Sequence, residues 1–209
     1  MTPQERAVLY NRAFPDRPPL SWNVDWLCGT WCIGAQYKNP NRLHGAYPYG
    51  YLKRVHSMFP EAQNILHVFS GGLTLAEARK AAWPFDGDLF DIEHRTMQLV
   101  DCKGPEEGRY PTLVCDVMSL PLDWVGRFDL ILADPPYTTH DAEIYGTPMP
   151  NRAAVMKQLR KVCVRGGNLV WLDQMWPMHS SLHWKCWAHI GLVRSTNHRV
   201  RLVSMFTAV

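Results

Sequence analysis

Four short apolar runs in this sequence each end in an aspartate, and this repetition constrains the fold more than any other feature. The runs are Met97–Val100 before Asp101, Thr112–Cys115 before Asp116, Phe128–Ala133 before Asp134, and Asn168–Leu172 before Asp173. Short apolar runs of this length are typical of buried strands. Acidic residues that follow several parallel strands meet at one edge of a sheet, so we expect these carboxylates to lie close together.

The segments between these runs predict helices and one further strand. Apolar spacing and helix-forming residues favour helices at Tyr49–Met58, Leu73–Trp83 and Arg152–Val162, and Ile65–Phe69 is a further buried strand. The tail predicts an antiparallel hairpin of Ile190–Ser195 and Arg199–Phe206. Alternating strands and helices indicate an α/β fold, in which helices cover a mainly parallel sheet.

The first part of the chain lacks this pattern. Residues 1–43 are rich in Pro, Trp, Asn and Arg and show no clear periodicity. We expect them to form a loop-rich extension packed on a core of residues 44–209. A length of 209 residues suits one domain and leaves little for a second.

The most specific segment is Asp134-Pro-Pro-Tyr137, at the end of the Phe128–Ala133 run. Two consecutive prolines fix φ and remove two N–H donors, so the backbone is rigid and can aim the Asp134 carboxylate and nearby carbonyls at one point. Tyr137 adds a flat aromatic face. Acceptors beside an aromatic ring suit a planar base with an exocyclic amino group, whose hydrogens they accept while the base stacks.

This tetrapeptide resembles the signature of amino-methyltransferases, which move a methyl group from S-adenosylmethionine to N6 of adenine or N4 of cytosine. The segment His67-Val-Phe-Ser-Gly-Gly-Leu73 is similar to the glycine-rich cofactor motif of that family, with His67 at a position that is usually acidic and Leu73 at a glycine position. The resemblance implies a Rossmann-like fold with a seven-stranded sheet and an antiparallel C-terminal hairpin. It also implies S-adenosylmethionine as the cofactor.

The resemblance assigns residues to two sets. The expected catalytic residues are Asp134, Pro135, Pro136 and Tyr137. The expected cofactor-binding residues are Tyr47, Phe69, Ser70, Gly71, Gly72, Asp101, Asp116 and Asp134. Asp101 would accept the ribose hydroxyls and Asp116 the adenine amino group, and Asp91 is the rival of Asp101 for the ribose.

The expected reaction is methyl transfer to N6 of adenine in DNA, since Asp before Pro-Pro-Tyr is typical of the adenine enzymes. The alternatives are an RNA base amino-methyltransferase and a non-catalytic subunit that keeps the fold and binds nucleic acid. No separate target-recognition domain is expected, so specificity is short or comes from a partner subunit. The surfaces expected to face DNA are the segment from Thr138 to Arg152 and the Trp-rich N-terminus. The basic hairpin residues are either a solvated face or phosphate contacts; they are Arg194, His198, Arg199 and Arg201.

Composition narrows the remaining classes. A net charge of +3 permits a polyanionic partner. The sequence lacks the dense basic runs that are typical of a nucleic-acid-binding arm. The absence of a signal peptide and of a long apolar run predicts a soluble, cytoplasmic protein without membrane contact. No metal is expected. The spacing of Cys28, Cys32 and His44 does not match the close ligand pairs of a zinc site. A divalent-metal cluster of Asp116, Asp134 and Asp173 is not needed for the expected reaction, and cofactor contacts explain the first two better.

Overall fold

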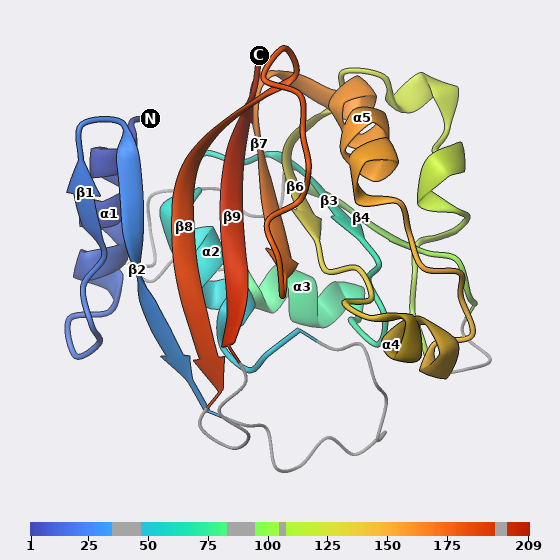
Figure 1. The fold of residues 1–209 in the computed structure, drawn as a ribbon, viewed down its shortest axis with the longest axis horizontal. Coiled ribbons are helices and arrows are strands. Elements are labelled where there is room, and N and C mark those ends of the chain that lie inside the picture. The colour runs from blue at the N-terminus through green and yellow to red at the C-terminus, as the bar shows by residue number, and fades with distance from the viewer. Residues whose placement is uncertain (35–46, 83–94, 105–107, 195–199) are drawn as a thin grey trace.

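The computed structural model describes residues 1–34, 47–82, 95–104, 108–194 and 200–209, and in them one mixed sheet runs through the protein (Figure 1). Its order is β1-β2-β8-β9-β7-β6-β3-β4-β5. The strands are β1 Ser21–Asn23, β2 Trp26–Ile33, β3 Asn64–Val68, β4 Thr96–Asp101, β5 Leu113–Val114, β6 Phe128–Ala133, β7 Cys163–Asp173, β8 Trp184–Arg194 and β9 Val200–Ala208. The helices are α1 Pro3–Ala13, α2 Tyr51–Met58, α3 Leu75–Ala81, α4 Thr139–Ile144 and α5 Arg152–Val162, with 3-10 turns η3 Val117–Ser119 and η4 Leu122–Trp124.

The predicted α/β core is confirmed. Strands β5, β4, β3, β6 and β7 are parallel, and β9 lies antiparallel between β7 and β8. These seven strands are the sheet that the resemblance implies, with its antiparallel C-terminal hairpin. The hairpin strands are longer than predicted, and residues 195–199 between them lie outside the described part of the chain.

The prediction of a loop-rich segment at residues 1–43 is wrong for its described part. Helix α1 begins at a capping box, in which Thr2 and Glu5 cap each other's backbone amides and Pro3 takes the first turn. Strand β2 then pairs with β8 in parallel, so the sheet has nine strands instead of seven. The physical reason is the alternation in β2, which buries Leu27, Trp31 and Ile33 and exposes Cys28, Thr30 and Cys32.

Helices lie on both faces of the sheet (Figure 1), and buried side chains form two hydrophobic clusters. One core cluster joins α1, α2 and α3 to one face, and a second joins α5 to the other. The crossover from β7 to β8 contains no helix, and residues 174–183 cross that second face as coil. No helix among the described residues is long and apolar enough to cross a bilayer.

Candidate active site

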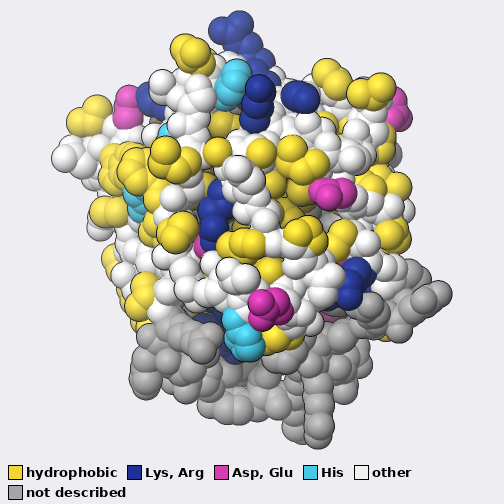
Figure 2. All heavy atoms as spheres, turned by 45° about the vertical axis from the view of Figure 1, so that its right-hand side comes forward, with side chains coloured by type: hydrophobic (Ala, Val, Ile, Leu, Met, Phe, Trp, Pro, Cys, Tyr) yellow, Lys and Arg dark blue, Asp and Glu magenta, His cyan; other side chains and the backbone are white. Residues whose placement is uncertain are grey.

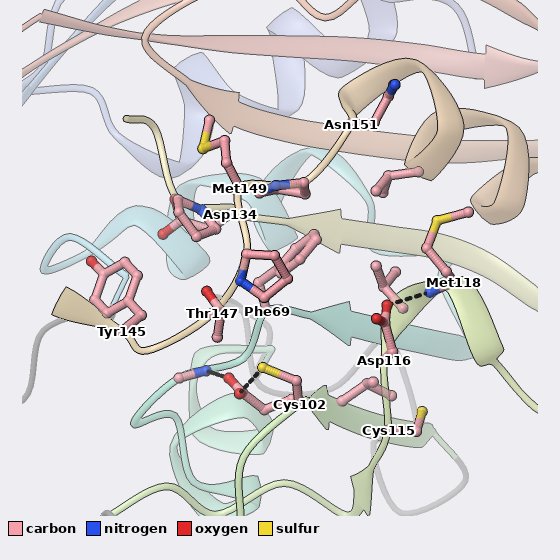
Figure 3. Close-up of a pocket in the computed structure, with 18 of the residues that line it drawn as sticks. Phe69, Cys102, Cys115, Asp116, Met118, Asp134, Tyr145, Thr147, Met149 and Asn151 are labelled. Carbon is pink, nitrogen blue, oxygen red and sulfur yellow. Dashed lines mark hydrogen bonds between the residues drawn. The ribbon is translucent and has the colours of Figure 1, made fainter. Parts of the chain in front are cut away.

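A cavity of about 270 Å³ opens at the carboxyl ends of β3, β4, β5 and β6 (Figure 3). Segment 145–151 and the first turn of α5 line it opposite the strand ends. Six of the predicted site residues line this cavity: Phe69, Gly71, Asp101, Asp116, Asp134 and Pro136. The strand-end positions explain this convergence, because parallel strands deliver their carboxyl ends to the same edge.

The other predicted residues do not line the cavity. Ser70 and Gly72 belong to the same turn as Gly71, and Pro135 and Tyr137 to the same loop as Asp134. Tyr47 is buried and stacks on Tyr51, with ring centroids 5.3 Å apart. The roles of all these residues stay predictions.

The glycine turn after β3 is held by backbone geometry and by Asp101. Phe69 and Gly71 both have positive φ, at 59° and 52°, a conformation that glycine adopts without a steric cost. The Gly71 amide donates to Asp101 Oδ2 at 2.8 Å, and the Ser70 amide donates to the Val100 carbonyl at 3.1 Å. The end of β4 therefore fixes the turn that the sequence predicts to approach the cofactor.

Asp101 is buried and accepts further hydrogen bonds on its other oxygen. The Lys103 amide lies 3.1 Å and Arg109 Nη1 3.3 Å from Asp101 Oδ1. Arg109 also lines the cavity, and no motif in the sequence indicates it. The rival ribose ligand, Asp91, lies outside the described residues.

Asp116 lines the cavity from the end of β5, the strand next to β4. Its side chain is exposed and caps η3, where Oδ1 accepts from the Met118 amide at 2.8 Å (Figure 3). A carboxylate has about four lone-pair directions, so Asp116 keeps acceptor capacity for an amino group in the cavity.

Asp134 follows β6 and is partly buried beside a tyrosine and an arginine. The Tyr137 hydroxyl donates to Asp134 Oδ1, and the Arg201 guanidinium lies 4.6 Å from the centre of the Tyr137 ring. Burial raises the pKa of Asp134 to about 7, because it outweighs the opposing effects of Arg201 and the Tyr137 hydrogen bond, and the charge of Asp173 raises it further. This carboxyl group therefore titrates near neutral pH.

Arg152 and Arg201, which the sequence analysis considered as contacts to nucleic acid, both have partners within the protein. Arg201 lies over Tyr137, and Arg152 is paired with the buried Asp173, with Nε 2.6 Å from Oδ2. Arg201 contacts the Tyr137 ring and Arg152 the Tyr137 carbonyl, so both arginines lie against the Asp134–Tyr137 loop. Contact of either residue with phosphate stays a prediction. Arg199 and His198 lie outside the described residues.

Residues 145–151 belong to the segment from Thr138 to Arg152 that the sequence predicts to face DNA, and they line the cavity. Tyr145, Thr147, Met149 and Asn151 come from this segment, and Figure 3 shows them around Phe69 and Asp134. On the face of the molecule that Figure 2 shows, hydrophobic side chains are widespread, and Lys and Arg side chains do not form a continuous stripe. Segment 145–151 therefore bounds the cavity, and its contact with DNA stays a prediction.

His67, at the position that is usually acidic in the resembling family, is fully buried. Its pKa is lowered to about 3 by burial, so the ring is neutral at neutral pH. The Tyr47 ring meets it edge-on at 5.8 Å, and neither ring nitrogen has a hydrogen-bond partner among the described residues. An acidic side chain in this apolar setting would carry a large desolvation cost.

Comparison with known proteins gives structural matches only. No protein-family model matches the sequence, and no curated protein is significantly similar to it. Among solved structures, TrmN from Thermus thermophilus is 15% identical with a TM-score of 0.51, over 79% of this chain and 50% of TrmN. The chain has the fold of S-adenosylmethionine-dependent methyltransferases. It spans half the length of TrmN.

Two further matches are methyltransferases solved with S-adenosylhomocysteine. The 1,6-didemethyltoxoflavin-N1-methyltransferase of Burkholderia thailandensis is 13% identical, with a TM-score of 0.48 over 77% of this chain and 80% of that enzyme. The N-methyltransferase NodS of Bradyrhizobium japonicum is 14% identical, with a TM-score of 0.45 over 70% of this chain and 78% of NodS.

Proposed function

We propose that this protein transfers the methyl group of S-adenosylmethionine to an exocyclic amino nitrogen of a nucleobase, with N6 of adenine in DNA as the first substrate. One observation carries the proposal. The Asp134-Pro-Pro-Tyr137 loop lies at the end of β6, and Asp134 lines the same cavity as Gly71, Asp101 and Asp116. The proposed acceptor of the amino group thus lies beside the proposed cofactor site.

The residues of the cavity fit the cofactor. The glycine turn would lie against its methionine portion, Asp101 would accept the ribose hydroxyls, and Asp116 would accept the adenine amino group. A volume of about 270 Å³ is near the lower end of the range of small-molecule sites, roughly 300–1,000 Å³. When bound, S-adenosylmethionine supplies an electrophilic methyl group.

Asp134 orients the target amino group. In its ionised form it accepts an amino hydrogen, and the Pro135 carbonyl accepts the other, which draws the nitrogen lone pair away from the ring and makes it more nucleophilic. Tyr137 donates to one carboxylate oxygen and leaves the other for the substrate. Holding the reactants in contact supplies much of the acceleration, and a pKa near 7 also suits uptake of the released proton.

A second candidate is a non-catalytic subunit that binds nucleic acid. His67 and Leu73 favour it, because they replace residues of the cofactor motif in the resembling family, and both side chains are buried beside the glycine turn. The intact Asp134 loop favours the enzyme. Cofactor affinity separates the two, because a degenerate subunit would not bind S-adenosylmethionine at micromolar concentration.

The test is incubation with labelled S-adenosylmethionine and separate pools of unmodified DNA and RNA, followed by nucleoside mass spectrometry. N6-methyldeoxyadenosine in DNA is the expected product, and label only in RNA would move the substrate to an RNA base. Asp134→Ala should abolish transfer, whereas Asp123→Ala, the same change at an exposed aspartate, should not. Full activity of Asp134→Ala would refute the mechanism. If no label is transferred, calorimetric titration with S-adenosylmethionine shows whether the protein binds the cofactor. Binding without transfer would indicate that the substrate or a partner is missing.

A further inference from the structure

Asp173, at the end of β7, is a fully buried carboxylate that the proposed reaction does not use. It follows the same strand-end pattern as Asp101 and Asp134, yet it does not line the cavity. A buried carboxylate is costly unless it is paired and hydrogen-bonded. Its partners are the Trp171 indole at 3.2 Å, the Gln174 amide at 2.7 Å, and Arg152.

Arg152 binds Asp173 with two nitrogens. Nε lies 2.6 Å from Oδ2 and Nη2 lies 3.1 Å from Oδ1, the planar two-point geometry that arginine offers a carboxylate. The pair ties the first residue of α5 to the end of β7. Only 16% of the Arg152 side chain is exposed, so its orientation is set by these contacts.

The same guanidinium also reaches the catalytic loop. Arg152 Nη2 donates to the Tyr137 carbonyl at 3.0 Å, while the Tyr137 hydroxyl donates to Asp134. Pro135 and Pro136 have no N–H to donate, so these two residues cannot anchor the loop through backbone amides. Arg152 therefore links the loop to two separate elements of the fold.

We propose that Arg152, oriented by Asp173, is a positioning residue that holds Tyr137 and, through it, the Asp134 carboxylate in the orientation required for methyl transfer. This inference rests on the proposed function. Lysine can keep the charge opposite Asp173, but it lacks the planar fork that reaches two acceptors at once. Arg152→Lys thus separates charge pairing from positioning.

The first measurement does not depend on activity. Tyr137–Thr138 is the only Tyr–Thr pair in the sequence, so labelling tyrosine carbonyls with ¹³C and threonine amides with ¹⁵N gives one NMR correlation for this peptide bond. We expect Arg152→Lys to move the Tyr137 carbonyl resonance. The control is Arg160→Lys, at the other end of α5, where the guanidinium donates to the Cys163 carbonyl; it should leave the resonance in place.

The second measurement is methyl transfer by the same variants. Arg152→Lys should lower kcat by about ten- to a hundredfold, the cost of a small misplacement of a reacting group. The KM for nucleic acid and the affinity for S-adenosylmethionine should stay as in the wild type, and Arg160→Lys should keep full kcat. If Arg152→Lys does not fold, the double variant Arg152→Met/Asp173→Asn removes the buried charge together with its partner and serves instead.

The outcomes separate the two proposals. An unmoved Tyr137 resonance, or a full kcat in a variant with a moved resonance, overturns the positioning role and leaves the proposed function standing. If the wild-type protein transfers no methyl group to DNA or RNA, the proposed function is overturned. The NMR measurement then still decides whether Arg152 anchors the loop.

Discussion

Asp134→Asn should change how the stability of this protein depends on pH. Burial beside Asp173 raises the pKa of Asp134 from 3.8 to about 7, so between these values the folded protein retains a proton that the unfolded chain has lost. A group that binds more protons in the folded state makes stability fall as pH rises. Because Asp134 ionises in the unfolded chain but stays protonated in the fold, the wild type loses stability increasingly between about pH 4 and 7.

The magnitude follows from the two pKa values. Each pKa unit corresponds to about 1.4 kcal/mol, so the full effect approaches about 4 kcal/mol above pH 7. Between pH 5 and pH 8, the contribution of Asp134 to the free energy of unfolding of the wild type changes by about 2–3 kcal/mol. Asparagine does not titrate and still accepts the Tyr137 hydrogen bond, so the free energy of unfolding of the variant should gain this amount over the wild type across that range.

Urea unfolding at pH 5, 6, 7 and 8, followed by tryptophan fluorescence and extrapolated to water, measures the difference. The buried His56 and His67 titrate in both proteins, so their contributions cancel. Asp123→Asn, at an exposed site, should show a constant offset from the wild type. A difference between Asp134→Asn and the wild type that stays constant from pH 5 to 8 would show that the Asp134 carboxyl group is ionised throughout, and the reasoning would fail.

Three further variants test the site. Asp101→Asn should weaken S-adenosylmethionine binding by about tenfold, because the Gly71 amide and the ribose lose a charged acceptor; unchanged affinity by calorimetry would remove Asp101 from the cofactor site. His67→Phe should shift acid unfolding to lower pH, because a buried histidine with its pKa lowered from 6.5 to about 3 costs stability as pH falls below 6.5; circular dichroism at decreasing pH checks the midpoint. Arg201→Met should move the acidic limb of the pH–rate profile upward, because Arg201 lowers the pKa of Asp134; a limb at the wild-type pH would contradict that influence.

The sequence predicted an element correctly where the evidence for it lies in neighbouring residues, such as an apolar run that ends in an acidic residue. The strand ends at Asp101, Asp116 and Asp134 and the turn at Gly71 were predicted, and the structure brings them to one cavity. The N-terminal prediction was wrong although local signals were present. The capping box at Thr2 and the alternation in β2 are short, and the surrounding Pro, Trp and Asn residues indicated loop.

From Tyr51 onward, the sequence by itself determined the order of the core strands, the places of α2, α3 and α5, and the residues at the strand ends, because periodicity and turn chemistry act between adjacent residues. Only the tertiary structure decided which of these residues meet. Asp101 holds the Gly71 amide, 30 residues away, and Asp173 holds Arg152, 21 residues away. Such contacts depend on strand order and on which side chains become buried together, since burial is what makes a lone charge costly and selects its partner. The raised pKa of Asp134 has the same origin.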